Sequence, residues 1–336
     1  MKRVLSKLTS SLTGLRLQWS SQRIRPGRQA ALRWAGIDLQ EKHLHLVVIG
    51  AASNGSQIQV LECVSRELEG ELSADTLTDI VQSLASRPQR WSLLLPRDDY
   101  RLSVIPVPEV PDDELSQSVR WQLAPVLDFP VEDAAVDFMT IPVANSTKGH
   151  PSELYAIAAR GDTVTRFASL FREARVPLTA IDIHETAQRN LAARIEHHDE
   201  VLVMVAFHRQ AIQITFSWQG ELYLDRLLAE PRNDEDSPAR RAMLCERVAL
   251  QVQRSLDTVR ASHPFMQAAR IVVAGAPEGF VASMGALAAV PVEVMRPEAF
   301  LDLRATPALC DTVEFMRYFQ AIGTALRGFT SQESAT

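Results

Sequence analysis

The alternation of hydrophobic and polar residues predicts three consecutive strands in the first part of the chain, at 34–39, 43–49 and 56–64. The dipeptide Asn54-Gly55 before the third strand is typical of a tight hairpin turn. A helical pattern follows at 73–87, where a serine stands at the cap position and apolar residues recur at helical spacing. The run "WSLLLP" then indicates a buried strand. This part of the chain is therefore predicted to be β-β-β-α-β.

Between residues 97 and 177 the pattern describes a separate unit. A strand that ends in prolines precedes a helix at 111–127, which has Pro111 at its start and acidic residues in its first turn, as the helix dipole favours. Two more strands and a helix at 161–175 complete the segment. The sequence therefore predicts an inserted α+β subdomain, after which a strand and a helix at 178–197 return to the first half.

The opening pattern recurs from residue 201. Three alternating strands with short polar turns precede a long helix at about 238–262, and a strand, a glycine turn and a helix follow. A repeated unit indicates the fold more strongly than any single element. We therefore expect an α/β protein with a duplicated actin-like (ribonuclease H-like) fold, two halves around a cleft. The expected parts are a basic tail at 1–30, a first half at 31–96 with 178–197 and 311–328, the insert at 97–177, and a second half at 198–310.

Composition and charge exclude several classes of protein. The chain has 336 residues, 46% of them hydrophobic, and its apolar runs are far shorter than the ~20 residues that cross a bilayer. Residues 1–30 hold seven Lys and Arg and no acid, yet the net charge of the chain is −6, so the main body is acidic. This charge argues against nucleic acid as a partner, and Trp91, Trp121 and Trp218 are scattered along the chain. Because the tail lacks the apolar core of a secretory signal, we expect a cytoplasmic protein.

Two interpretations of residues 1–30 stay open. Apolar residues fit one stripe of a helix that lies on an anionic membrane surface or in a partner's groove; they are Val4, Leu5, Leu8, Leu12 and Leu15. The alternative is a solvated basic tail that forms no such helix.

The cysteine and histidine residues give no sign of a metal site. Cys63, Cys245 and Cys310 are widely spaced, and we expect buried, reduced thiols. His43 and His45 share one face of a strand, as ligands of a metal would. With no third ligand nearby we interpret them as part of a strand surface and expect no metal.

Several segments, in order, carry a resemblance to a known family. They are "GIDL" (36–39), the stretch from "VIPVPEV" to "AAVDF" (104–138), "TAIDIHETAQRNLA" (179–192), "RVALQVQRSLDTVR" (247–260) and "YFQAIGTALRG" (318–328). In this order and spacing the chain resembles PilM, the cytoplasmic actin-like protein of type IV pilus assembly, and its MSHA-pilus relative MshI. The resemblance covers nearly the whole chain after residue 30.

The resemblance implies a protein that binds another protein. The family captures the short cytoplasmic N-terminal peptide of a bitopic PilN-like or MshJ-like inner-membrane protein, in the groove between the first half and the insert. By resemblance we expect this chain to lie at the cytoplasmic face of the inner membrane. We expect four residues to line or support the groove, with a place in the core as the alternative: Leu102, Val104, Val119 and Leu123.

The loops that hold nucleotide in actin-like folds have lost their characteristic residues. Backbone N–H groups must approach phosphate closely, so these turns need glycine or small hydroxyl residues. Where the family pattern has D-x-G-[ST], this chain has 38–41 "DLQE", and the second hairpin, 206–210, is "AFHRQ", with neither acid nor glycine. Asp38 and Gly275 stay as remnants of the cleft. Asp38 could position a metal-bound water, but we expect its carboxylate to cap the turn, because the partners of such a site are absent. We therefore expect a pseudo-ATPase without a cofactor, and an ATP-binding switch as the alternative.

Overall fold

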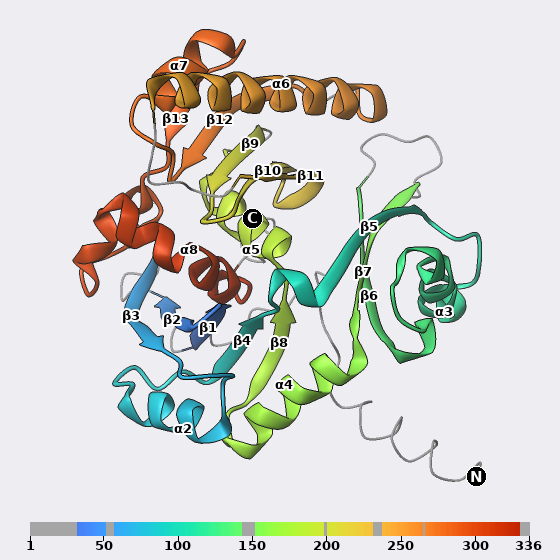
Figure 1. Ribbon diagram of the computed structural model, residues 1–336, viewed down its shortest axis with the longest axis vertical. Coiled ribbons are helices and arrows are strands. Elements are labelled where there is room, and N and C mark those ends of the chain that lie inside the picture. Colours follow the sequence, from blue (N-terminus) through green and yellow to red (C-terminus); the bar gives the residue numbers. More distant parts are fainter. Residues whose placement is uncertain are drawn as a thin grey trace.

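The computed structural model describes residues 32–51, 57–142, 152–197, 200–230, 237–264 and 266–329. Two larger sheets and a third, smaller sheet make up this part of the chain (Figure 1). The predicted basic tail at 1–30 and the predicted turn at Asn54-Gly55 lie outside the described residues.

The first half is built on a six-stranded sheet in the order β14-β3-β2-β1-β4-β8. Its strands are β1 (Arg33–Gln40), β2 (His43–Ala51), β3 (Ile58–Glu67), β4 (Arg90–Leu94), β8 (Leu178–Asp182) and β14 (Leu301–Asp302). The predicted antiparallel meander β1-β2-β3 is confirmed, and β4 adds to it parallel to β1. Strand β14 was not predicted, because two residues are too few to show an alternation.

Alternate residues of β1 point to opposite faces of this sheet, and helices cover both. Ala35 and Ile37 face the core beneath α2 (Ala74–Ser83) and α4 (Gly161–Glu173). Gly36 faces α8 (Thr312–Leu326), and a Cβ there would lie 2.1 Å from the carbonyl oxygen of Ala321. Only a glycine lets α8 approach the strand this closely.

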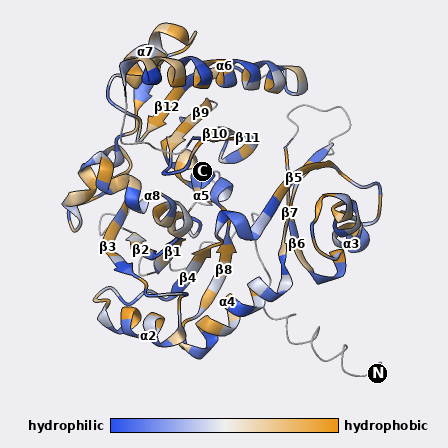
Figure 2. Ribbon diagram, viewed as in Figure 1, coloured by the Kyte–Doolittle hydropathy of each residue, from blue (hydrophilic) through white to orange (hydrophobic). Residues whose placement is uncertain are grey.

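The second half repeats this plan on a five-stranded sheet in the order β11-β10-β9-β12-β13. Its elements are β9 (Val201–Phe207), β10 (Ala211–Trp218), β11 (Glu221–Ala229), α6 (Pro238–Ser262), β12 (Ala268–Ala274), α7 (Phe280–Leu287) and β13 (Val292–Val294). All residues of β9 are buried and hydrophobic, whereas α6 carries both hydrophobic and hydrophilic residues along its length (Figure 2). The strand therefore lies inside the protein, and α6 covers it with one face.

The two sheets share one topology and one central layer of helices. The order β3-β2-β1-β4 in the first corresponds to β11-β10-β9-β12 in the second, which confirms the predicted repeat. Helices α5 (His184–Ile195) and α8 lie between the sheets and bury residues of both in one core (Figure 1). They touch at Gly323, where a Cβ would lie 2.3 Å from the carbonyl oxygen of Ala187.

The insert has its own small sheet in the order β5-β7-β6, with one helix over it. Its elements are β5 (Tyr100–Pro106), α3 (Asp112–Gln122), β6 (Ala134–Thr140) and β7 (Glu153–Arg160). Helix α3 ends earlier than the predicted 111–127, and a short 3₁₀ turn at Ala124–Val126 contains Pro125. Helix α4, from the range 97–177, packs against α2 and the core of the first half.

Two expectations about single residues are wrong. Cys245 is buried, as expected, but Cys63 is only half-buried and Cys310 is exposed. His45 is not on a surface, because the Tyr318 ring of α8 covers it with the ring centroids 5.5 Å apart. Burial, with His43 and Arg317 nearby, lowers the pKa of His45 to about 4, so this imidazole is neutral at pH 7.

Candidate functional site

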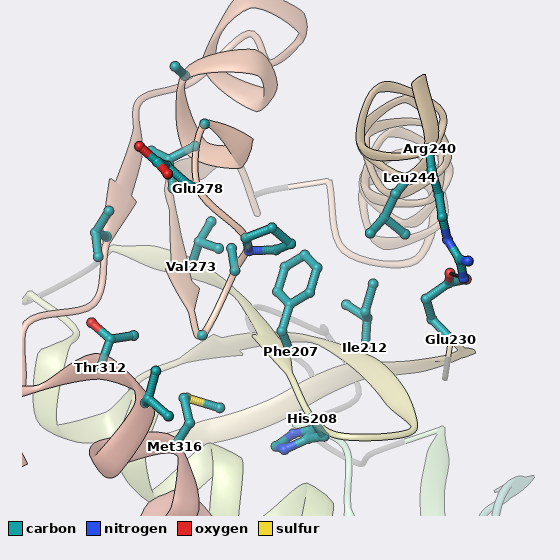
Figure 3. Close-up of a pocket in the computed structure, with 18 residues that line it drawn as sticks. Phe207, His208, Ile212, Glu230, Arg240, Leu244, Val273, Glu278, Thr312 and Met316 are labelled. Carbon is teal, nitrogen blue, oxygen red and sulfur yellow. Dashed lines mark hydrogen bonds and ion pairs between the residues drawn. The ribbon is translucent and has the colours of Figure 1, made fainter. Parts of the chain in front are cut away.

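A cleft opens between the two halves, where the β1–β2 and β9–β10 hairpins approach each other. It consists of two cavities. The hairpin cavity, of about 410 Å³, is bounded by both hairpins, Arg97 and Gln320. The loop cavity, of about 910 Å³, is bounded by the loop 275–279 together with Ile212 and Leu244 (Figure 3). The hairpin cavity adjoins the turns at 38–41 and 206–210, and the loop cavity adjoins Gly275, which the resemblance implies as remnants of a nucleotide site.

Asp38 does not line either cavity. It is 1% exposed, and its carboxylate accepts a hydrogen bond from the Gln40 amide at 2.6 Å. Burial raises the pKa of Asp38 to about 6, although the Gln40 hydrogen bond acts against this rise. The side chain therefore fastens the end of β1 rather than facing the space where a metal-bound water would lie.

Glu41 bridges the two hairpins. Its backbone has φ 48°, in the left-handed region that glycine adopts more readily. From there the carboxylate reaches the second hairpin, where it accepts a hydrogen bond from Gln210 at 3.0 Å and lies 3.8 Å from the Arg209 guanidinium. The Glu41 and Arg209 side chains are 57% and 74% exposed. This ion pair is therefore screened by water and weak in itself.

Met316 of α8 lines both cavities, together with Phe207, His208 and Val313. It packs against Gly275, which has φ 68°: a Cβ on this glycine would lie 2.7 Å from the Met316 Cγ. In Figure 3 the Met316 side chain lies beside His208 at the edge of the loop cavity, with Phe207 above them. The glycine of the loop is thus used to accommodate a methionine side chain of the same protein.

A buried ionic group lies under the hairpin cavity, and the sequence analysis missed it. Arg97, just after β4, forms an ion pair of 2.7 Å with Glu185 at the start of α5. Tyr100 donates a hydrogen bond to the other Glu185 oxygen at 2.7 Å, and Arg97 also donates to Gln213 of β10 at 3.3 Å. Both oxygens of the carboxylate are therefore already paired. No sequence motif joins these residues, since they come from four different elements.

Asp225 of β11 belongs to the same group. Its carboxylate accepts a hydrogen bond from Gln213 at 2.8 Å. Burial, with the Glu185 carboxylate nearby, raises the pKa of Asp225 to about 7. The group thus joins both halves and the insert through charged side chains.

The four residues expected at a partner groove do not form one surface. Val119 and Leu123 are fully buried between α3 and the sheet of the insert, so their expected place at the groove is corrected to the core. Leu102 is half-buried and packs against the cores of both halves. Only Val104, at 48%, is exposed.

The exposed apolar residues of the insert lie elsewhere on it. Trp121 and Val126, at the end of α3 and in the following turn, are 51% and 54% exposed. In the sequence Trp121 is one of several scattered tryptophans. Its position at the end of the helix with the acidic start is the one feature of the sequence that points to an exposed tryptophan.

Two further searches cover only the residues that the structure describes. Among them no group of three or more His, Cys, Asp and Glu could hold a metal ion. None of their helices is both long and apolar enough to span a membrane.

Comparison with known proteins identifies the fold. No protein-family model and no curated protein matches the chain. Among solved structures, a chain of a PilM–PilN type IV pilus biogenesis complex is 17% identical, with a TM-score of 0.63; the match covers 90% of this chain and 99% of that one. A weaker likeness is a protein from Bacteroides thetaiotaomicron with an actin-like ATPase fold and unknown function, 12% identical over 83% of this chain and 96% of that one, with a TM-score of 0.45. The predicted actin-like α/β fold is confirmed.

Proposed function

We propose that the chain is a non-catalytic docking protein of a type IV pilus, of the MSHA type, or of a related secretion system. In this proposal it belongs to the PilM/MshI family and binds the cytoplasmic N-terminal peptide of a PilN-like or MshJ-like inner-membrane protein. Its support is the sequence resemblance together with the structural likeness to a chain of the PilM–PilN complex. The protein then lies in the cytoplasm beside the inner membrane. There each Lys or Arg among residues 1–30 contributes about 1 kcal/mol of attraction to anionic lipid.

The observation that carries the non-catalytic part is the position of Glu41. A carboxylate between the two hairpins repels phosphate where an actin-like ATPase attracts it. Glu185, a buried carboxylate beside Arg97 of the hairpin cavity, has both oxygens paired, which does not favour a role as general base. The residues of this cleft do not fit Mg·ATP.

The second candidate is an ATP-binding switch whose nucleotide state controls the binding of the partner. The cleft with its two cavities favours it, because these cavities lie where an actin-like fold holds nucleotide. A switch of this kind requires that Glu41 and Met316 move aside for the ligand.

Calorimetry with Mg·ATP distinguishes the two candidates. We expect no heat of binding for the purified wild-type chain, either with Mg·ATP or with Mg·ADP. The double variant Gln40→Gly, Glu41→Ser, which restores the D-x-G-S pattern, serves as comparison. Micromolar binding of Mg·ATP to the wild type would refute the pseudo-ATPase and favour the switch.

The chemistry of the insert suits a basic peptide with an apolar anchor. Residues 97–142 contain ten Asp and Glu but three Lys and Arg. Val104 and Trp121 are both exposed, but on opposite faces of this acidic unit: Val104 pairs with Tyr155 on the sheet face away from α3, whereas Trp121 lies on α3 itself. Tryptophan is a frequent anchor at interfaces. We therefore expect these two side chains to contribute to binding of the partner.

Fluorescence anisotropy with a labelled synthetic peptide, the N-terminal cytoplasmic segment of the PilN-like protein of the same bacterium, measures this. Val104→Asp and Trp121→Ala should each weaken binding about tenfold. Leu287→Asp is the control, because Leu287 is also exposed, at 55%, but lies on the second half. Equal affinities for all four proteins would exclude both faces of the insert at these positions, and no binding by the wild type would count against the docking function itself.

A further inference from the structure

The cleft between the halves is filled from inside at two places that are far apart in the sequence. Glu41 of the first hairpin contacts Arg209 and Gln210 of the second. Met316 of α8 lies against Gly275 and touches both cavities. Each contact joins elements on opposite sides of the cleft.

The contacts of Glu41 resemble those of an anionic ligand. Its carboxylate presents two oxygens, one near a guanidinium and one accepting from an amide, which is how proteins bind carboxylate and phosphate groups. The Arg317 guanidinium lines the same cavity, as do Arg97, which is already paired with Glu185, and the Asp98 carboxylate. The positive group that lies near Glu41 is Arg209, and the Glu41 carboxylate supplies its counter-charge across the cleft.

Met316 acts through its volume. Its side chain lines both the loop cavity and the hairpin cavity, as do Phe207, His208 and Val313, so we expect a molecule that occupies both cavities to displace it. Methionine has three rotatable bonds and fills irregular gaps without fixed geometry. Gly275 provides the space, because any side chain there would collide with Met316.

A third contact joins α8 to the end of β9. The Gln320 amide of α8 and the His208 ring at the end of β9 are 3.3 Å apart, and the His208 and Phe319 rings meet edge to face with centroids 5.5 Å apart. The end of β9 is therefore fastened to α8, which also packs on the sheet of the first half.

We propose that the chain closes its own cleft, with Glu41 in the place of a nucleotide phosphate between the hairpins and Met316 in the passage beside Gly275. The closed arrangement of the two halves then needs no nucleotide. The inference rests on the proposed non-catalytic function and explains by which side chains the cleft excludes the ligand.

Binding of Mg·ATP to full-length variants tests the two positions. Met316→Ala joins the two cavities, and Glu41→Ser removes the negative charge. The double variant should bind Mg·ATP at least tenfold more tightly than the weakest binding that calorimetry detects, whereas Met316→Leu, which keeps the volume, should show no heat of binding, like the wild type. A folded double variant that binds no better than the wild type would overturn the proposal.

Amide hydrogen exchange gives a second, independent test that needs no gain of binding. In Glu41→Gln the charge is lost but the shape is kept, so residues 40–43 and 207–211 should exchange at least threefold faster than in the wild type. Exchange in β13, the edge strand of the second sheet that β12 separates from β9, is the internal control. Unchanged exchange at both hairpins would overturn the role of Glu41 in closing the cleft.

These outcomes are separable from failure of the proposed function. Tight binding of Mg·ATP by the wild type would refute the non-catalytic function whatever the variants do. A wild type that binds no Mg·ATP, with variants that gain none, leaves the docking function standing and refutes only the roles of Glu41 and Met316.

Discussion

At the scale of single residues, the buried carboxyl of Asp38 shows why sequence alone misjudges the cleft. The residue type and its position near the end of β1 match an actin-like phosphate loop, and the resemblance therefore implies a remnant of the cofactor site. In the structure the side chain is enclosed and bonded to Gln40. The burial of Asp38 depends on how α8 and the neighbouring strands pack, which cannot be predicted from the residues next to it in the sequence.

The raised pKa of Asp38 predicts a dependence of stability on pH. Because the folded pKa, about 6, exceeds the ordinary 3.8, the folded state holds the proton more tightly, and stability falls as pH rises from about 4 to 6. A difference of this size corresponds to about 3 kcal/mol in the free energy of unfolding. Asp38→Asn keeps an acceptor for Gln40 and removes this dependence.

Denaturant unfolding of the wild type and Asp38→Asn at pH 4 and pH 7 measures this pH dependence of stability. From pH 4 to pH 7 the free energy of unfolding of the variant should rise relative to that of the wild type by up to about 3 kcal/mol. His45 has a lowered pKa and acts in the opposite sense in both proteins, so it cancels in the comparison. A constant difference between the two proteins would contradict the prediction.

At the scale of elements, alternation and helical spacing predicted most strands and helices, but not which face each one buries. The helix at 111–127 was placed from its acidic start and Pro111, and α3 begins there. Val119 and Leu123 are fully buried because they pack against β7. The residues of β7 that they contact come from a distant segment of the sequence: Leu154, Ala156 and Ala158. Strands β13 and β14 were missed, because three and two residues show no period.

The small core of the insert predicts a local effect of substitution. Leu123→Ala removes most of a fully buried side chain and should lower stability by about 2–5 kcal/mol. The substitution leaves a cavity, and the surrounding side chains lose their contacts with the leucine. Since this core is separate from those of the two halves, hydrogen exchange should rise first in β5, β6 and β7. Trp121→Ala, on the exposed face of the same helix, should change stability by about 0.5 kcal/mol or less. Equal acceleration throughout both halves would show that the insert does not open by itself.

At the scale of the whole molecule, the repeat was predictable and the shared layer was not. Each half shows the same order of strands, which the recurring pattern from residue 201 had indicated. The sequence did not reveal that α5 and α8 bury residues of both sheets in one core. Because the two halves share this core, we expect them to unfold together.

Gly323 is the position at which this expectation can be tested. A Cβ there would lie 2.3 Å from the carbonyl oxygen of Ala187 in α5, and the Gly323 carbonyl accepts a hydrogen bond from Asn190 at 2.9 Å. Gly323→Ala should force the two helices apart and lower stability by about 1–3 kcal/mol or more. Gly285→Ala is the matched control, because a Cβ on this helical glycine of α7 would meet nothing within 4 Å, and the change should stabilise the helix by up to about 1 kcal/mol.

Hydrogen exchange during denaturant unfolding of Gly323→Ala, followed in β2 and β9, reports on the two halves separately. If α5 and α8 form one layer that both sheets need, both strands should lose protection at the same, lower denaturant concentration. Loss of protection in β2 well before β9 would mean that the second half holds its fold without α8. The cleft would then lie between two independently stable units, and its closure would depend on the contacts of Glu41 and Met316 rather than on a common core.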